Sequence, residues 1–170
     1  MNDLSILTKD GKLDYSKMGE IPTLPNALGF ENFIQAFRNS PNARLTKSQN
    51  NVYYNTPAGE IKIYLPRAHG HFFKNGIYGN GKQDRGELTG ALMQILDKPL
   101  FITKDRQDKL YFYKPFRIRT TNTADEFLDL ISVSVDKNGR MEYRTTYEDM
   151  YNQVLDMING YEVVYKARLE

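Results

Sequence analysis

Apolar residues recur at helical spacing in three segments of the chain: residues 28–39, 85–97 and 147–159. In the first segment Phe30, Phe33, Ile34 and Phe37 are three or four positions apart, which predicts one apolar face of a short amphipathic helix. Thr146 precedes the third segment and is its expected N-cap, because a Thr hydroxyl can accept from a free amide of the first turn.

Elsewhere apolar and polar positions alternate, a period of two that is typical of half-buried β-strands. The expected strands are residues 43–48, 51–54, 60–65, 100–104, 109–119, 128–136, 140–146 and 161–168. Asn138-Gly139 is a strong signal for a tight hairpin turn between two of them. The whole pattern predicts an α+β fold, a small mainly antiparallel β-sheet with about three helices packed on one face.

The ends of this pattern differ in regularity. Residues 1–27 carry Gly and Pro among short apolar pairs, and we interpret them as an irregular N-terminal arm, for which a linker from the upstream part of a larger polyprotein is one explanation. Residues 28–170 then form a single domain, which is long enough to bury an adequate core. Residues 66–84 are rich in Gly and predict a long loop, a length that in compact domains is usually functional or disordered.

The composition excludes several classes of protein. The chain has no Cys, so disulfides, thiolate zinc sites and Cys nucleophiles are ruled out. No apolar run approaches the roughly 18 residues that span a bilayer, and we expect no membrane partner. The first residues lack the basic and apolar regions of a Sec signal peptide. Cytoplasmic residence and delivery into the cytoplasm of a target cell both fit the sequence.

Positive charge is concentrated in residues 98–119, which hold seven Lys or Arg, two Asp and five aromatic residues in a chain of net charge +2. The predicted strand places five of its residues on one face as an anion-binding wall: Lys109, Tyr111, Tyr113, Arg117 and Arg119. Basic residues interleaved with aromatic ones suit single-stranded nucleic acid. The alternative is an ordinary antiparallel sheet with a solvated Lys/Arg face and an aromatic core face.

Both histidines of the chain lie in Arg67-Ala68-His69-Gly70-His71. In this loop His69 and His71 could supply a general base and a general acid near neutral pH, and Arg67, Lys74 and Lys82 could bind phosphate. Metal ligation and ordinary packing are the alternatives. The metal interpretation lacks a third ligand nearby in the sequence, and we expect no metal and no cofactor.

Residues 76–83 nearly match a Walker A loop, with Gln83 where a Mg²⁺-binding Ser or Thr would stand. No buried parallel strand precedes them, so a nucleotide-binding P-loop is disfavoured. A lid that lets the backbone approach a phosphate and a plain flexible loop both remain open.

Hydroxyl groups cluster in Tyr143-Arg144-Thr145-Thr146-Tyr147. While the strand lasts, Tyr143, Thr145 and Tyr147 would share one side, from which they could position a phosphate or donate to an oxyanion. The alternative is that Thr146 serves only as a helix cap and Tyr147 only as a core residue.

The chemistry that remains is narrow. No acid pair has glycosidase spacing and no GxSxG motif appears. A set of His, Arg, Lys, Thr and Tyr suits RNA cleavage by its own 2′-hydroxyl, because the substrate carries the nucleophile and the protein moves two protons and stabilises charge on the phosphorane.

The order of elements resembles the phage- and mobile-element-associated nuclease domains of the barnase–EndoU–colicin–RelE superfamily, which often end polyvalent or polymorphic-toxin proteins. The resemblance covers roughly residues 13–168. It rests on the layout of these features: residues 13–20, the small-sheet hairpin, the Arg67–His71 motif, the helix running into residues 97–102, the basic strand, residues 143–147 and the last strand. It implies a metal-independent endoribonuclease acting on RNA, tRNA included, with a cognate inhibitor or immunity protein as a further partner.

The resemblance also implies roles for individual residues. His69 or His71 would be base or acid, Arg117 and Arg119 would hold phosphate, and Thr145 and Tyr147 would orient the scissile group. A catalytic Glu of the barnase kind is not evident, and Glu87 is the nearest offer. Two alternatives to an enzyme stay open: a non-catalytic nucleic-acid- or protein-binding module, and a phage structural domain whose basic hairpin is merely solvated.

Overall fold

The computed structural model describes residues 6–46, 50–70, 88–118, 126–149 and 152–168. The helices are a short 3-10 helix η1 (Tyr15–Lys17), α1 (Phe30–Arg38), α2 (Leu65–Gly70), α3 (Leu92–Asp97) and α4 (Gln153–Gly160). The strands are β1 (Ala43–Leu45), β2 (Asn51–Thr56), β3 (Gly59–Tyr64), β4 (Phe101–Lys104), β5 (Leu110–Ile118), β6 (Glu126–Lys137), β7 (Arg140–Glu148) and β8 (Glu162–Lys166). In these ranges no helix has the length and apolar character needed to cross a membrane.

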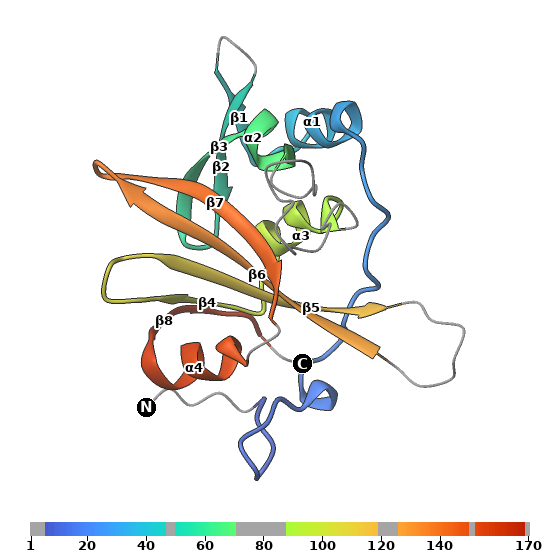
Figure 1. Ribbon diagram of the computed structural model, residues 1–170, viewed down its shortest axis with the longest axis vertical. Coiled ribbons are helices and arrows are strands. Elements are labelled where there is room, and N and C mark those ends of the chain that lie inside the picture. Colours follow the sequence, from blue (N-terminus) through green and yellow to red (C-terminus); the bar gives the residue numbers. More distant parts are fainter. Residues whose placement is uncertain (1–5, 47–49, 71–87, 119–125, 150–151, 169–170) are drawn as a thin grey trace, which may run out of the picture.

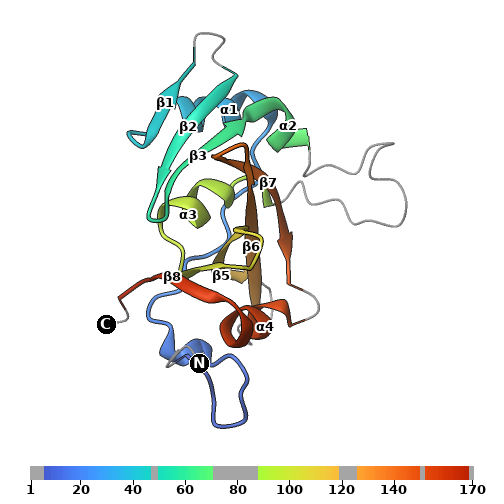
Figure 2. The same cartoon turned by 90° about the vertical axis from the view of Figure 1, so that its left-hand side faces the viewer.

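The strands form one eight-stranded sheet in the order β1-β2-β3-β7-β6-β5-β4-β8. β3 and β7 run parallel, whereas the other neighbours are antiparallel. The sheet curls into a half-barrel, so that β1–β3 turn away from the plane of β4–β6 (Figures 1 and 2). The expectation of a small mainly antiparallel sheet with about three helices is therefore wrong: within the described ranges the sheet is mixed, has eight strands and packs against four α-helices.

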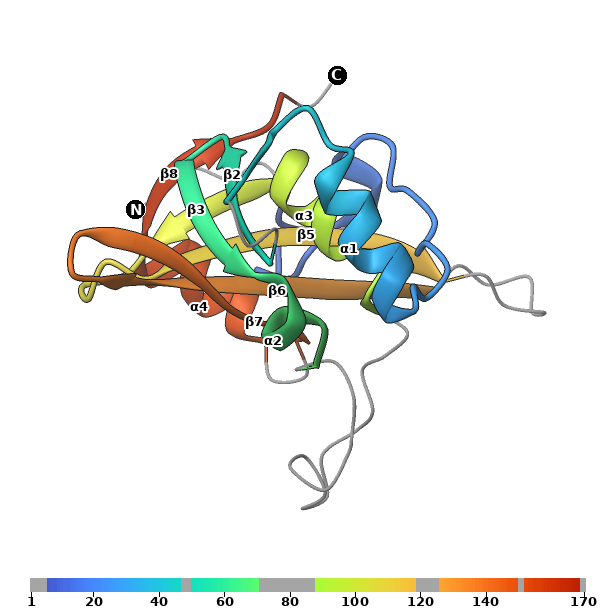
Figure 3. The same cartoon turned by 90° about the horizontal axis from the view of Figure 1, so that it is seen from above.

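Helices cover both faces of the sheet, not one. On the inner face of the curl α1, α2 and α3 pack with a first core cluster that includes Phe33, Ile63, Leu92, Phe112 and Leu130. On the other face α4 and the N-terminal arm pack with a second cluster that includes Ile6, Phe101, Tyr113, Ile131 and Met157 (Figures 1 and 3). Because β5 lies between β6 and β4 and both core clusters pack against it, its residues are buried on both faces, which suits its aromatic content.

Two local features shape the β6–β7 hairpin. Asn138 and Gly139 both have positive φ, 56° and 84°, as a tight turn of the expected kind requires. A bulge between Val133 and Ser134 shifts the register, so that Val133 faces Thr145 and Ser134 faces Tyr143. The bulge changes which residues of β7 share a face.

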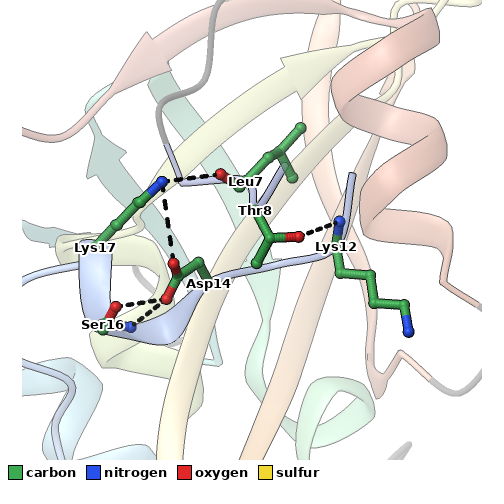
Figure 4. A network of polar contacts seen from close by, with 6 residues as sticks. All are labelled: Leu7, Thr8, Lys12, Asp14, Ser16 and Lys17. Atoms are coloured by element: carbon green, nitrogen blue, oxygen red, sulfur yellow. Dashed lines mark hydrogen bonds and ion pairs between the residues drawn. The ribbon is translucent and has the colours of Figure 1, made fainter. Parts of the chain in front are cut away.

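The N-terminal arm is irregular but held by specific bonds. Asp14 accepts from the backbone amide of Ser16 at 3.1 Å and lies 4.0 Å from the Lys17 ammonium, which also donates to the Leu7 carbonyl at 3.2 Å (Figure 4). Farther along, Arg117 of β5 donates its backbone amide to Pro22 and accepts from the Leu24 amide, both at 2.8 Å. Beside it, a Cβ at Gly90 would collide with the Asn26 carbonyl oxygen, so glycine is required there.

Candidate functional site

A cleft opens where β3 runs parallel to β7 and continues directly into α2. Its volume is about 250 Å³, and it is lined by Asn51, Lys62, Tyr64, Arg67, Ala68, Glu142 and Tyr143. Leu65 and Ala68 are buried and anchor α2 on the first core cluster, which leaves Arg67 on the exposed side of the helix. Lys62 and Glu142 face each other across the parallel pair. The local sequence of β3 and α2 therefore brings charged side chains together at the rim of the sheet.

The charges in this cleft do not neutralise one another directly. Within the described ranges neither Lys62 nor Arg67 has a carboxylate oxygen within 4.0 Å, and Glu142 has no Lys or Arg nitrogen within that distance. The Arg67 guanidinium carbon lies 5.5 Å from the centre of the Tyr64 ring, close enough for a cation–π contact. Lys62 and Arg67 together outweigh the charge of Glu142, so the cleft has a net positive charge that favours an anionic ligand. A ligand that also donates a hydrogen bond would satisfy the Glu142 carboxylate.

A chain of hydroxyl groups fixes Tyr143 at the cleft wall. Its hydroxyl lies 2.7 Å from Thr146 Oγ1, which lies 2.7 Å from Ser132 Oγ on β6. Thr146 and Ser132 are buried, so this chain runs from the cleft into the sheet. Hydrogen bonds in a water-poor interior hold a side chain in one orientation, which is what a positioned hydroxyl requires.

Thr146 is consequently not a helix cap, and this correction has a simple cause. β7 continues to Glu148, beyond the strand end expected from the sequence, and α4 begins only at Gln153. Asp149 caps α4 instead, since its two carboxylate oxygens accept from the backbone amides of Gln153 and Val154, each at 2.8 Å.

His69 lies outside the cleft, in the core. It is 7% exposed and packs against Phe30 and Phe33, with ring centroids 5.6 and 5.0 Å away. Its Nε2 is 2.9 Å from the Leu28 carbonyl oxygen, and because a carbonyl can only accept, Nε2 carries the proton. This geometry is that of a packing histidine. The candidates His71, Lys74, Lys82, Glu87 and Arg119 lie outside the described residues.

The anion-binding wall expected on β5 is not formed. Tyr111 and Tyr113 are buried, and their hydroxyls donate to Asp105 at 2.9 Å and to Asp129 at 2.7 Å. Burial, and after it the charge of Asp129, raise the pKa of Tyr113 well above its usual value. The parity expected from the sequence was correct, but the arm and α4 cover the face that was expected to be open.

The other residues of that prediction are also apart. Arg117 is half-buried, with its guanidinium carbon 5.2 Å from the centre of the Phe127 ring, and Lys109 lies at the β4–β5 turn, where its amide donates to Asp105 at 3.0 Å. Thr145 and Tyr147 follow the bulge and do not share the side of Tyr143. Tyr147 packs on the second cluster and donates to Gln153 at 2.6 Å, and burial raises its pKa to about 12. Of the expected site residues in the described ranges, Arg67 and Tyr143 line the cleft.

Sequence reasoning missed Lys62, Tyr64 and Glu142 as site residues. The alternation of residues 60–65 does place Lys62 and Tyr64 on the polar side of β3, but nothing local to the sequence shows that β7 pairs with β3. Among the described residues no three His, Asp or Glu side chains gather as metal ligands would. Comparison with protein-family models, with curated proteins and with solved structures gives no match.

Proposed function

We propose that this protein is a metal-independent endoribonuclease whose reaction takes place in the cleft between β3, β7 and α2. The observation that carries the proposal is the convergence of Lys62, Arg67, Glu142 and Tyr143 on one cleft, with the three charged groups free of direct ion pairs among the described residues. A phosphodiester flanked by a 2′-hydroxyl complements this set. Its phosphate brings negative charge to the cations, and its 2′-hydroxyl offers a proton that the carboxylate can accept.

The roles follow from the chemistry of each group. Glu142 accepts the proton of the 2′-hydroxyl while its oxygen attacks phosphorus. Arg67 and Lys62 stabilise the additional charge on the phosphorane, and the Tyr143 hydroxyl, held by Thr146, donates a proton to the 5′-oxygen as the P–O5′ bond breaks. The products are a 2′,3′-cyclic phosphate and a 5′-hydroxyl. RNA, tRNA included, is the proposed substrate, and a cognate inhibitor that covers the cleft is the proposed protein partner.

A second candidate function is a non-catalytic RNA-binding module at the same cleft. It is favoured by the position of His69, whose Nε2 is engaged by the Leu28 carbonyl, so that no described histidine reaches the cleft. Binding alone needs only the two cations and the exposed ring of Tyr64.

One experiment separates the two functions. Purified protein is incubated with tRNA and with unstructured RNA in EDTA, and the ends of any products are identified. The nuclease proposal expects cyclic-phosphate ends from the wild type, loss of cleavage in Glu142→Gln, and full cleavage in Glu162→Gln. Glu162 is the matched control because it is exposed on β8, at the far edge of the sheet from β1.

The other outcomes are equally informative. If the wild type leaves RNA intact but binds it, and binding weakens in Lys62→Met, the nuclease proposal is rejected and the RNA-binding module is supported. Cleavage that survives in Glu142→Gln would exclude Glu142 as the base and overturn the mechanism.

A further inference from the structure

A row of polar side chains leads away from the cleft across four strands. The register places Arg44 on β1 opposite Tyr53 on β2, Tyr53 opposite Lys62 on β3, and Lys62 opposite Glu142 on β7. Residues that are directly opposite in a sheet project from the same face. With neighbouring strands about 4.8 Å apart, the row extends about 14 Å, from the cleft to the sheet edge at β1.

The row lies on the face that the inner core does not use. Alternate residues of the same two strands, Val52, Tyr54, Ile61 and Ile63, are buried in the first core cluster. Tyr53 and Lys62 are half-buried, whereas Arg44 is exposed and Tyr64 is 43% exposed. The Tyr64 ring is therefore open to solvent beside Arg67, where a base could stack on it.

Tyr53 is held by two arginines from different strands. The guanidinium carbons of Arg44 and Arg140 lie 4.4 and 5.2 Å from the centre of its ring. Arg140 also donates to the Tyr53 hydroxyl at 3.1 Å. The ring and its two guanidinium groups therefore form a preorganised surface on which a planar base can stack.

The charge of the same face is positive. Four cations, Arg44, Lys62, Arg67 and Arg140, lie along it, against the carboxylates of Glu60 and Glu142. Glu60 is paired with Arg44, so the excess falls on the cleft and on Arg140. This is the combination of stacking surface and backbone-neutralising cations that the sequence predicted on β5. Its members lie instead on β1, β2, β3, α2 and β7.

We propose that this row is a track for an unpaired strand of RNA leading into the cleft, an inference that rests on the proposed function and names its substrate as single-stranded. Bases stack on Tyr64 and on the Tyr53–Arg44–Arg140 group, while phosphates lie near Lys62 and Arg67. A duplex does not fit this track, because paired and stacked bases cannot offer their faces to the tyrosine rings.

The test measures binding separately from cleavage. Glu142→Gln protein in EDTA is titrated with fluorescent RNA: a dinucleotide, which is too short to reach from the cleft to Tyr53, a single strand of about ten nucleotides, which is within the range typical of such tracks, and a duplex of the same length. We expect the longer single strand to bind at least tenfold more tightly than either of the other two. Adding Tyr53→Ala should weaken the longer strand about fivefold or more, and much more than the dinucleotide.

Two further variants control for folding and charge. Tyr53→Phe keeps the ring and should retain most of the affinity, whereas Arg106→Ala removes an exposed cation of the β4–β5 turn and should change nothing. Equal affinity for duplex and single strand, no effect of Tyr53→Ala, or no binding of any RNA at low salt would each overturn the track. Failure of the nuclease proposal appears separately, as intact RNA with wild-type protein while the binding pattern persists.

Discussion

Lys62 on β3 stands opposite Glu142 on β7, at the register pair that joins these two parallel strands. The strands share this single pair, and beside it β3 leaves the sheet to become α2. The cleft therefore exists because two hairpins, β2–β3 and β6–β7, meet side by side and then separate. A positive and a negative group are fixed at the point of separation without forming an ion pair.

The first prediction concerns Lys62. Replacing it with Met should weaken RNA binding severalfold at physiological salt and lower the slope of log affinity against log salt by about one, because one phosphate contact is lost. The measurement is a salt titration of binding. Lys104→Met is the matched control, since Lys104 lies at the far end of β4 and pairs with Asp108 at 3.7 Å. An unchanged slope in Lys62→Met would remove Lys62 from the site.

His69 should behave as a structural residue. His69→Ala leaves a cavity between Phe30 and Phe33 and an unpaired Leu28 carbonyl, so we expect a loss of about 2–3 kcal/mol in the free energy of unfolding. His69→Gln keeps a donor and should lose less. Activity normalised to the folded fraction should stay near the wild-type value in both. A His69→Gln protein that is folded but inactive would show that His69 takes part in the reaction.

Asp149, not Thr146, should control the start of α4. Asp149→Ala removes both side-chain acceptors and should cost about 1 kcal/mol, whereas Asp149→Ser retains one acceptor and should cost less. Amide hydrogen exchange gives a local measurement, because Gln153 and Val154 should exchange faster in Asp149→Ala. Thr146→Val interrupts the hydroxyl chain to Tyr143 and should leave these two amides protected.

Asp129 should give stability an unusual dependence on pH. Burial raises its pKa above the ordinary 3.8, although the hydroxyls of Tyr113 and Tyr15 partly oppose the shift. The folded state then holds this proton more tightly than the unfolded state, so the contribution is present below 3.8 and is lost as pH rises through the folded pKa. As pH rises from 3.8 to the folded pKa, the free energy of unfolding of the wild type should therefore fall relative to that of Asp129→Asn. Above the folded pKa the difference between the two proteins should be constant.

Urea unfolding at a series of pH values measures this difference. Asp156→Asn is the control for the loss of a carboxylate, because Asp156 is exposed on α4. A wild type that gains stability over Asp129→Asn as pH rises would mean that hydrogen bonding outweighs burial at Asp129.

Local structure was largely predictable from the sequence. The spacing of Phe33, Ile34 and Phe37 located α1, and Asn138-Gly139 located the β6–β7 turn. The sequence did not predict which strands pair with each other or which sheet faces are covered by other elements. β3 and β7 are far apart in the chain, and alternation in each shows which residues face the core but not which strand lies alongside. The curl of the sheet follows from that pairing, so it could not be predicted from the sequence either.

The prediction of the candidate site on β5 was wrong for the same reason. Tyr111 and Tyr113 were placed correctly on one face of β5, but a period of two cannot reveal that a second layer covers that face. Thr146 and Asp149 are both good capping residues three positions apart, and only the length of β7 decides between them. Arg67 was found because it lies beside a conspicuous motif, whereas Glu142 has no local signal at all.

The contacts of the N-terminal arm depend on segments that are translated after it. Ile6 and Met18 share their cluster with Phe101, Tyr113 and Met157, which follow much later in the chain. The backbone hydrogen bonds of Pro22 and Leu24 likewise form only once Arg117 has been made. Until β5 and α4 have been translated, the apolar residues of the arm are therefore exposed to chaperones and proteases.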